Sequence, residues 1–332
     1  MFVDFKRIKS KHFNEKTNHL MKIGLDIMGG DYAPKATVLG AIEAHSQLKN
    51  NQHLVLVGDK DQIIPILQDQ NFNPDHFEYI HTTEVIGMGE HPTKAIVQKP
   101  NSSISVGFQL LKTGDLDSFA SAGNTGAMLV GSMFSVKAIP GVIRPAIASI
   151  APQLAGGYGI LLDVGANADC KPDNLLQFGI LGSLYIEHIY GVKNGKVGLM
   201  NIGEEEEKGN LLAQAAYTMM KETSLINFIG NIEGRDLFNN TADVIVCDGF
   251  TGNVMLKLAE SFYVITRKKG FKDEFFDRLN YEEIGGSPIL GINAPAVIGH
   301  GVSSPKAIKN MVLMSRDMVE TNLIEKFKAA FN

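Results

Sequence analysis

The chain has 332 residues, of which 44% are hydrophobic and 20% are charged. This composition is typical of a globular protein that buries a large core, either in one large α/β domain or in two smaller ones. The formal net charge of −5 argues against a general nucleic-acid-binding protein, because such proteins usually carry a basic excess. We therefore expect no nucleic-acid partner.

Two cysteines, Cys170 and Cys247, are too few for a disulfide framework or for a zinc site of their own. We expect no metal centre, and a reducing cytoplasm is the simplest compartment. No apolar run approaches the roughly 18 residues that a membrane span needs. The amino terminus also lacks the hydrophobic core of a signal peptide, which favours a cytoplasmic location.

Residues 1–20 are mostly polar and rich in lysine and arginine, and a regular apolar pattern starts only at Met21. We predict that this first segment is a flexible extension, with a basic membrane-touching arm as the alternative. The remaining residues, 21–332, are predicted to form a single α/β domain.

Short apolar segments alternate with loops of glycine and small polar residues, and each loop leads into a helical pattern. The first helix is entered at Pro34, and the final helix is expected over 315–331. Strands that alternate with helices predict a three-layer α/β/α fold with a mostly parallel sheet. The predicted strands include 23–27, 54–57, 146–150, 159–164, 197–203, 243–248 and a last strand that starts at Ala296.

The loop at residues 121–126 lies between a short apolar strand and an apolar helix. The first backbone N–H groups of a helix have no partner within it and lie at the positive end of its dipole, so they can hold a phosphate or a developing oxyanion. Gly123 and Gly126 allow close approach of the backbone, and Asn124 and Thr125 offer donors or a helix cap. A simple cap explains this loop equally well when it is taken alone.

Two later loops have the same character. Residues 165–172 combine glycine, amide, carboxylate, cysteine and lysine, and residues 249–254 repeat glycine, threonine and asparagine. Cys170 has no neighbouring histidine to activate it, so a small buried side chain is its simpler interpretation. Lys99 and Arg144 are candidate cations for phosphate, although Arg144 also fits a surface anchor for its own loop.

These loops are expected to meet, because parallel sheets bind ligands beyond the carboxyl ends of their strands. The glycine loops lack the standard dinucleotide and P-loop fingerprints, so we expect no cofactor. The sequence therefore predicts a polar, glycine-lined crevice that binds an anionic group and stabilises an oxyanion.

A series of short motifs follows in order between about Met21 and about Ala307: Asp26-Ile27-Met28-Gly29-Gly30-Asp31, Ser121-Ala122-Gly123-Asn124-Thr125-Gly126-Ala127, Arg144-Pro145-Ala146, Leu162-Asp163-Val164-Gly165-Ala166-Asn167, Asn201-Ile202-Gly203-Glu204-Glu205, Lys208-Gly209-Asn210, Asp248-Gly249-Phe250-Thr251-Gly252-Asn253 and His300-Gly301. The series resembles the motifs of the bacterial phosphate acyltransferase family of phospholipid synthesis. Because so many linked motifs occur in order, the resemblance is highly specific.

The resemblance implies that an acyl-acyl carrier protein and inorganic phosphate are converted into an acyl phosphate and free carrier protein. It also implies a fold like that of isocitrate dehydrogenases and phosphate acetyltransferases, and a homodimer. We further expect weak association with the inner face of a membrane, and hand-off of the product to a membrane glycerol-3-phosphate acyltransferase.

The chain departs from the family pattern in two places. Ile27 stands where the family usually has alanine, which is a minor change. Residues 255–285 are expected to form a helical segment for dimerisation or docking, but the part from Lys257 to Gly285 is shorter than in relatives whose helical protrusion carries an apolar tip for membranes. The resemblance therefore does not imply that this chain attaches to a membrane through this segment.

A thioester already has a good leaving group, so neither a metal nor a covalent nucleophile is required. The reaction needs phosphate placed in line with the carbonyl group, and donors for the tetrahedral oxyanion. We predict that Asn124 and Asn167 are catalytic, with Asn167 and the backbone near Gly165 facing the oxyanion. Lys171 or His300 is predicted to protonate the departing sulfur.

The residues predicted to bind phosphate or substrate lie on the same loops, with Lys99 or Arg144 assisting: Asp26, Gly29, Gly30, Asp31, Lys99, Ser121, Gly123, Thr125, Gly126, Arg144, Asp163, Gly165, Asp248 and Asn253. A basic cluster at the end of a predicted helix is a candidate docking site for the acidic carrier protein, although favourable helix capping is its simpler interpretation: Arg267, Lys268, Lys269 and Lys272.

Two other classes of function remain as alternatives. A relative of phosphate acetyltransferases or dehydrogenases would bind coenzyme A or a nicotinamide. A non-catalytic acyl-carrier or lipid-sensing module would bind acyl chains without phosphate-dependent turnover. The glycine and asparagine loops favour an enzyme over such a module.

Overall fold

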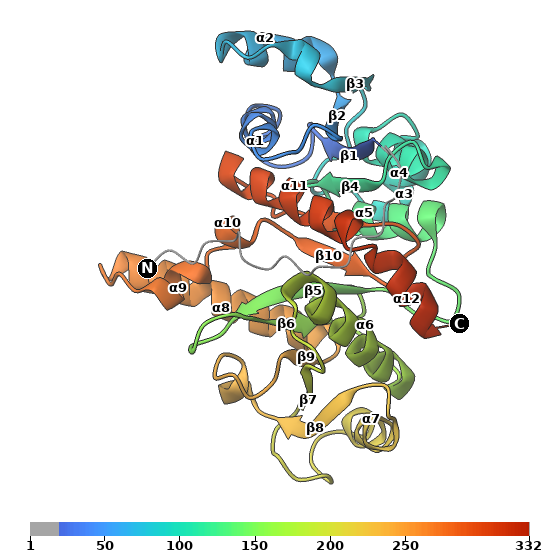
Figure 1. Ribbon diagram of the computed structural model, residues 1–332, viewed down its shortest axis with the longest axis vertical. Coiled ribbons are helices and arrows are strands. Elements are labelled where there is room, and N and C mark those ends of the chain that lie inside the picture. The colour runs from blue at the N-terminus through green and yellow to red at the C-terminus, as the bar shows by residue number, and fades with distance from the viewer. Residues whose placement is uncertain (1–19, 332) are drawn as a thin grey trace.

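The computed structural model describes residues 20–331. The extension predicted for residues 1–20 lies outside the described residues, apart from Leu20. The described part of the chain forms a three-layer α/β/α structure, in which helices cover both faces of a central sheet (Figure 1).

One sheet of eleven strands runs through the described residues, in the order β3-β2-β1-β4-β11-β10-β5-β6-β9-β7-β8. The strands are β1 (Met21–Asp26), β2 (Gln52–Gly58), β3 (Glu78–His81), β4 (Ser118–Ser121), β5 (Ala146–Pro152), β6 (Tyr158–Leu162), β7 (Lys196–Met200), β8 (Asn227–Ile232), β9 (Val244–Val246), β10 (Ser287–Leu290) and β11 (Ala296–Ile298). Most neighbours pair in parallel, which confirms the predicted fold class.

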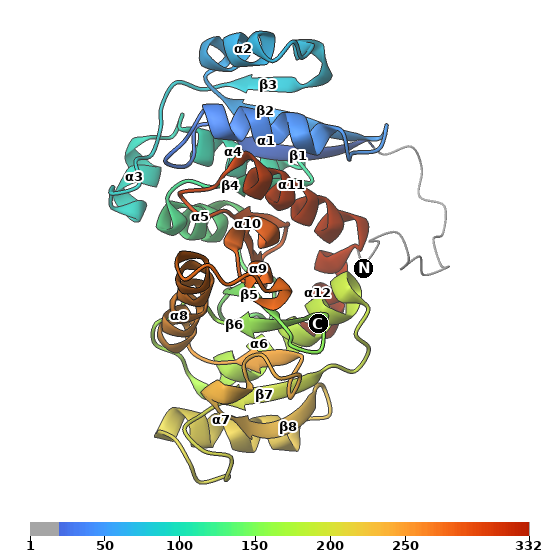
Figure 2. The ribbon, with the colours of Figure 1, turned by 90° about the vertical axis from the view of Figure 1, so that its left-hand side faces the viewer.

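Helices α3, α5 and α8 lie on one side of the sheet, and α11 and α12 lie on the other (Figure 2). The helices are α1 (Lys35–His45), α2 (Lys60–Asp69), α3 (Pro92–Gln98), α4 (Ser103–Thr113), α5 (Thr125–Gly131), α6 (Pro172–Tyr190), α7 (Leu211–Glu222), α8 (Gly249–Lys268), α9 (Glu274–Arg278), α10 (Tyr281–Ile284), α11 (Pro305–Glu320) and α12 (Leu323–Phe331). Shorter turns are η2 (Pro74–His76), η3 (Ser132–Val136) and η4 (Gly234–Asp236).

Two apolar cores lie on the two faces of the sheet, because successive side chains of a strand point to opposite faces. In β2, Leu54 and Leu56 belong to one core, and Val55 and Val57 belong to the other. Both faces of the central strands are buried. Their sequences are therefore continuous apolar runs, without the alternation of apolar and polar residues that a half-exposed strand shows.

A short antiparallel seam joins the two halves of the sheet. Strand β5 pairs with β10 through only two residue pairs, Ile289 with Ile147 and Leu290 with Ala146. Strand β10 is also antiparallel to β11, and β5 is antiparallel to β6. The two halves therefore run in opposite directions, and the functional loops form one cluster in each half instead of a single row.

The long final helix predicted over 315–331 is wrong, because two helices occupy this region. Helix α11 ends at Glu320 and α12 begins at Leu323. Between them, Asn322 adopts a left-handed conformation with φ of 51°, which asparagine tolerates better than most residues. Helix α11 begins at a serine cap, because Ser304 Oγ accepts a hydrogen bond from the Ala307 N–H group.

We predict that Gly40→Ala lowers the free energy of unfolding by about 1–3 kcal/mol, because overpacking a tight contact forces neighbouring groups apart. Gly40 lies where α1 packs against α11, and an added Cβ would be 2.5 Å from Ile308 Cβ. Urea unfolding measures the change. Gly234→Ala is the matched control, because its Cβ would meet nothing within 4 Å, and equal urea midpoints for both variants would contradict the packing argument.

Candidate active site

The first loop cluster is built around the buried carboxylate of Asp26 at the end of β1. This carboxylate accepts hydrogen bonds from Ser121 Oγ at 2.6 Å and from the Met28 N–H group at 2.9 Å. Ser121 Oγ in turn accepts from the Gly123 N–H group at 2.9 Å. Burial raises the pKa of Asp26, and these hydrogen bonds oppose that rise. The loops that follow β1 and β4 are thereby held together.

Two glycines allow the loop after β1 to pass close to its neighbours. A Cβ on Gly29 would lie 2.5 Å from Asp26 Oδ2, and Gly30 has a φ of +108° that disfavours other residues. The Asp31 N–H group then donates to Gly301 O at 2.7 Å. The first cluster therefore joins three loops, which follow β1, β4 and β11.

Asn124 caps helix α5 and also anchors a neighbouring loop. Its Oδ1 accepts from the Ala127 N–H group at 2.9 Å, and its Nδ2 lies 3.0–3.1 Å from the carbonyl oxygens of Gly87, Met88 and Glu90. An amide has only two N–H hydrogens. This geometry leaves neither of them for an oxyanion and gives Asn124 a positioning role.

The two candidate phosphate cations do not line the central cavity, which lies between α8 and strands β5, β6 and β10. Lys99 Nζ lies 2.5 Å from Glu90 Oε1 and 2.8 Å from Val85 O. Arg144 Nη1 donates to Asp169 O at 3.0 Å. Both side chains therefore hold loops at the rim, which matches the surface-anchor alternative for Arg144.

The second loop cluster is built around the buried carboxylate of Asp163, which directly follows β6. Its oxygens accept from the N–H groups of Ile147 at 3.0 Å and Asn167 at 2.7 Å, and from Asn167 Nδ2 at 2.9 Å. Asn167 Nδ2 also donates to Pro145 O at 2.8 Å. Both side-chain amide hydrogens of Asn167 are thus engaged within the protein, and its backbone carbonyl oxygen accepts from the Gly249 N–H group.

The start of α8 completes this second cluster. Asp248 caps the helix by accepting from the Thr251 N–H group at 2.8 Å. Asn253 Nδ2 donates to Val164 O at 2.9 Å. Gly165 has a φ of +134°, and a Cβ there would lie 3.1 Å from Asn253 Nδ2.

Cys170 and Lys171 lie beyond this cluster. Burial, with a smaller effect of Asp163 and Asp248, raises the pKa of Cys170 to about 11. The thiol is therefore protonated near neutral pH, as expected for a residue that is not a nucleophile. Lys171 precedes the first turn of α6, its side chain is exposed, and it does not line the central cavity.

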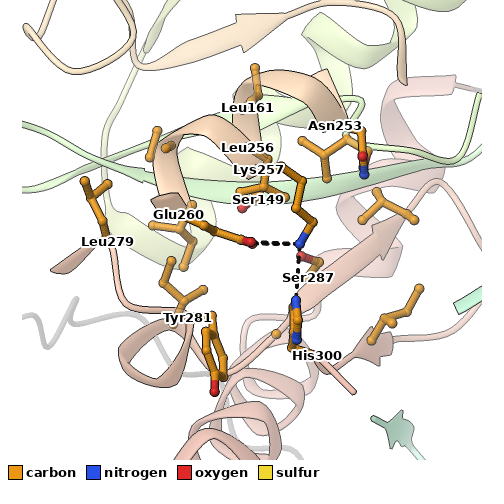
Figure 3. Close-up of a pocket in the computed structure, with 18 of the residues that line it drawn as sticks. Ser149, Leu161, Asn253, Leu256, Lys257, Glu260, Leu279, Tyr281, Ser287 and His300 are labelled. Atoms are coloured by element: carbon orange, nitrogen blue, oxygen red, sulfur yellow. Dashed lines mark hydrogen bonds and ion pairs between the residues drawn. The ribbon is translucent and has the colours of Figure 1, made fainter. Parts of the chain in front are cut away.

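Residues from both clusters line one cavity of about 330 Å³ that lies between α8 and strands β5, β6 and β10 (Figure 3). Thr125 and His300 come from the first cluster, and Val164 and Asn253 come from the second. The cavity thus brings together three of the predicted site residues, Thr125, Asn253 and His300.

A lysine on α8 reaches across this cavity. Lys257 Nζ lies 2.8 Å from Glu260 Oε2 and 3.2 Å from His300 Nε2 (Figure 3). The ring of Tyr281 stacks on the His300 ring, with centroids 5.0 Å apart. Side chains from α8, from α10 and from the loop after β11 therefore meet at one point.

The contact with Lys257 defines the protonation state of His300. An ammonium group has only hydrogen-bond donors, so Nε2 must be the acceptor and the ring proton lies on Nδ1. Burial lowers the pKa of His300, and the positive charge of Lys257 lowers it further. His300 Nδ1 is buried without a partner among the described residues. In this arrangement His300 is a neutral acceptor, and Lys257 is the cation at the cavity.

Lys257, Glu260 and Tyr281 are site residues that the sequence did not predict. Lys257 and Glu260 are three residues apart on α8, a spacing that is usually read as an exposed helix pair. The apolar neighbours of the pair do not distinguish it from an exposed pair, because one of them, Leu258, is itself exposed.

The basic cluster lies at the far end of α8. The helix ends at Lys268, and Gly270 follows with a φ of +76°, as predicted for a capped end. Arg267 pairs with Asp277 at 3.0 Å, whereas Lys269 is exposed. Lys272 lines a separate polar groove, so the cluster does not contribute to the central cavity.

Residues 20–331 contain no group of three or more histidine, cysteine, aspartate or glutamate side chains that could hold a metal ion. In the same part of the chain, no helix combines the length and the apolar character that crossing a membrane requires.

Solved structures place the fold among phosphotransacetylases. The chain is similar to the EutD phosphotransacetylase of Staphylococcus aureus, with a TM-score of 0.63 and 15% identity over 91% of this chain and 95% of that one. A phosphotransacetylase of Streptococcus pyogenes has the same TM-score and 16% identity over 93% and 96% of the two chains. At this identity the likeness concerns the fold alone.

Sequence comparisons define the family. The profile of a family described as "Fatty acid synthesis protein" matches residues 21–273. The phosphate acyltransferase of Dictyoglomus turgidum is 45% identical over 94% of this chain and 98% of its own length, and that of Pelotomaculum thermopropionicum is 44% identical over 93% and 95%. The chain therefore belongs to the bacterial phosphate acyltransferase family, which confirms the resemblance.

We predict that the His300 ring titrates at higher pH in Lys257→Met than in the wild type, because the lysine charge lowers the histidine pKa. Glu260→Gln should move the titration to lower pH, because the glutamate charge raises that pKa. NMR of the His300 ring protons measures both shifts. Movement in the same direction in the two variants, or no movement, would rule out the contact described above.

Proposed function

We propose that the protein transfers a fatty acyl group from an acyl-acyl carrier protein to inorganic phosphate, giving an acyl phosphate for phospholipid synthesis. The observation that carries this proposal is the 45% identity with a phosphate acyltransferase along nearly the whole chain. The cavity supports it, because apolar walls and a lysine meet there, and burial raises the pKa of both nearby thiols, Cys170 and Cys247.

The chemistry requires direct attack on the thioester. A phosphate oxygen forms a bond to the carbonyl carbon, the carbonyl oxygen becomes an oxyanion, and collapse of this intermediate breaks the carbon–sulfur bond. The thiolate then takes up a proton as free carrier protein leaves. We assign the anionic oxygens to the part of the cavity lined by Lys257 and Thr125, because a fixed cation stabilises developing negative charge most strongly away from water.

The proton for the sulfur comes from Lys257 in this proposal, in place of His300 or Lys171. His300 accepts a hydrogen bond from Lys257 and holds the ammonium group in place, whereas Lys171 does not line the cavity. Asn124 and Asn167 act as positioning residues, since their amide hydrogens are engaged with loop oxygens. The remaining predicted loop residues shape the two clusters.

The outer face of α8 supports a homodimer. Apolar side chains recur on it every three or four residues and are exposed in one copy of the chain: Phe250, Val254, Leu258, Phe262 and Ile265. Apolar rows of this kind on a helix are normally covered by a partner. We propose that the segment 255–285 pairs with the same segment of a second copy.

The remaining partner assignments follow from the same proposal. The basic cluster of Arg267, Lys268, Lys269 and Lys272 would attract an acidic carrier protein. We infer a cytoplasmic protein that associates weakly with the inner membrane face and passes its product to a membrane glycerol-3-phosphate acyltransferase. An acyl phosphate has an apolar chain, which favours delivery close to a membrane.

We expect purified protein to release carrier-protein thiol from palmitoyl-acyl carrier protein only when phosphate is present, and hydroxylamine should trap the acyl phosphate as a hydroxamate. Lys257→Met should lower kcat by about 100-fold or more, as is usual for loss of one group that stabilises transition-state charge. Lys326→Met is the matched control, because Lys326 is exposed on α12 and lies outside both the cavity and the basic cluster, and it should retain kcat.

Other outcomes of this assay would overturn parts of the proposal. Tight binding of the acylated carrier protein without release would favour the acyl-sensing module. Activity with acetyl-coenzyme A alone would favour a phosphate acetyltransferase. Normal turnover by Lys257→Met would remove the lysine from the mechanism.

We predict that Leu258→Lys converts a dimer into a monomer, because the substitution places a charge in the apolar row of α8. Light scattering during size-exclusion chromatography measures the mass. Lys326→Leu on α12 is a control for a change of residue type at an exposed site. A monomeric wild-type protein at micromolar concentration would argue against the dimer.

A further inference from the structure

We infer that the cavity beneath α8 binds the acyl chain along β5, and that its apolar far end determines the chain length accepted. This inference rests on the proposed function, since it names the place where one part of the substrate lies. Three observations carry it: the chemical difference between the two ends of the cavity, the small side chains along β5, and the volume of the cavity.

One end of the cavity is polar and lies at the two loop clusters. Ile147 marks this end, because its N–H group donates to Asp163 and its carbonyl oxygen accepts from the Val164 N–H group. Asn253 bonds to Val164 O, and Thr125 lines the cavity. The thioester and phosphate would occupy this end.

The other end is apolar. Leu237, Phe238 and Leu279 line it, and their backbone neighbours place it at the end of β5. The Leu154 N–H group donates to Phe238 O, and Arg278 Nη2 donates to Gln153 O. Figure 3 shows Leu279 and Asn253 on opposite sides of the Lys257–His300 contact. An acyl chain oriented by its thioester would therefore point toward Leu279.

The floor between these ends is a row of side chains from one face of β5. Ile147, Ser149 and Ala151 alternate with Ala148 and Ile150, which belong to the core on the opposite face, although Ile150 also contacts the cavity. The row becomes smaller toward the far end, and Ala259 on α8 faces the same space. Small side chains on both walls leave room that larger residues would fill.

The dimensions suit a medium-length or long acyl chain. From Ile147 to Ala151 the strand covers about 13 Å, at about 3.3 Å per residue. The cavity volume is about 330 Å³, and a water-sized group takes up about 30 Å³, so the cavity holds on the order of ten methylene groups. A hexanoyl chain would end before the apolar far end, whereas the first carbons of a palmitoyl chain, about ten of them, would fill the cavity and reach that end.

The test compares palmitoyl-acyl and hexanoyl-acyl carrier protein as substrates of Ala259→Leu. The added carbons should displace the end of the longer chain. We expect kcat/KM for the palmitoyl substrate to fall about tenfold or more, because each methylene lost from burial is worth about a fourfold change. The value for the hexanoyl substrate should change by less than about twofold. Ala330→Leu, on the exposed face of α12, is the matched control and should change neither.

A second variant acts in the opposite direction. Phe238→Ala opens the far end, so the ratio of kcat/KM for palmitoyl over hexanoyl substrate should rise. This variant also keeps the inference testable if Ala259→Leu fails to fold. Equal changes for both chain lengths in either folded variant would overturn the inference.

The same variants separate failure of this inference from failure of the proposed function. If the wild-type protein shows no phosphate-dependent release with either substrate, the proposed function fails. In that case, calorimetry of the binding of palmitoyl-acyl and hexanoyl-acyl carrier protein tests whether the cavity binds the acyl chain. Weaker binding of the palmitoyl form alone to Ala259→Leu would support the acyl site, and unchanged binding of both forms would refute it.

Discussion

Two buried carboxylates organise the molecule. A carboxylate is costly to bury unless hydrogen bonds satisfy its oxygens, and Asp26 and Asp163 each meet this constraint by accepting from nearby loops. The loops must close around the carboxylates, so their backbones pass close to one another, and Gly29 and Gly249 stand where a Cβ would collide. The glycine-rich motifs are therefore the consequence of two buried charges, one in each half of the sheet.

Helix α8 connects the two halves functionally. It begins at the cap formed by Asp248 in the second cluster and carries Lys257 to His300 in the first. Its inner face lines the cavity, while its outer face exposes the apolar row defined above. One helix thus supplies a wall, a cation and a candidate surface for a second copy, which explains its unusual mixture of apolar and basic residues.

The sequence was sufficient for the fold class because apolar strands, capped helices and glycine loops are local signals. Asp26, Gly29 and Asp163 could be selected because motifs mark strand ends. The role of Lys257 could not be predicted, since a lysine beside a glutamate on a helix has the same pattern when it faces solvent. The apolar part of the cavity also escaped prediction, because it depends on the register between β5 and β10, which are distant in the chain.

The short pairing between β5 and β10 contributes few backbone contacts between the two halves of the sheet. Only two residue pairs join the halves across the sheet, and the cavity occupies the space beside this short junction. On the opposite face of the sheet, α12 packs against α6, and this contact also holds the two halves together. A ligand in the cavity would add apolar contacts between the halves, and anything that binds the folded state selectively stabilises it. The substrate would thus act as a removable part of the hydrophobic core.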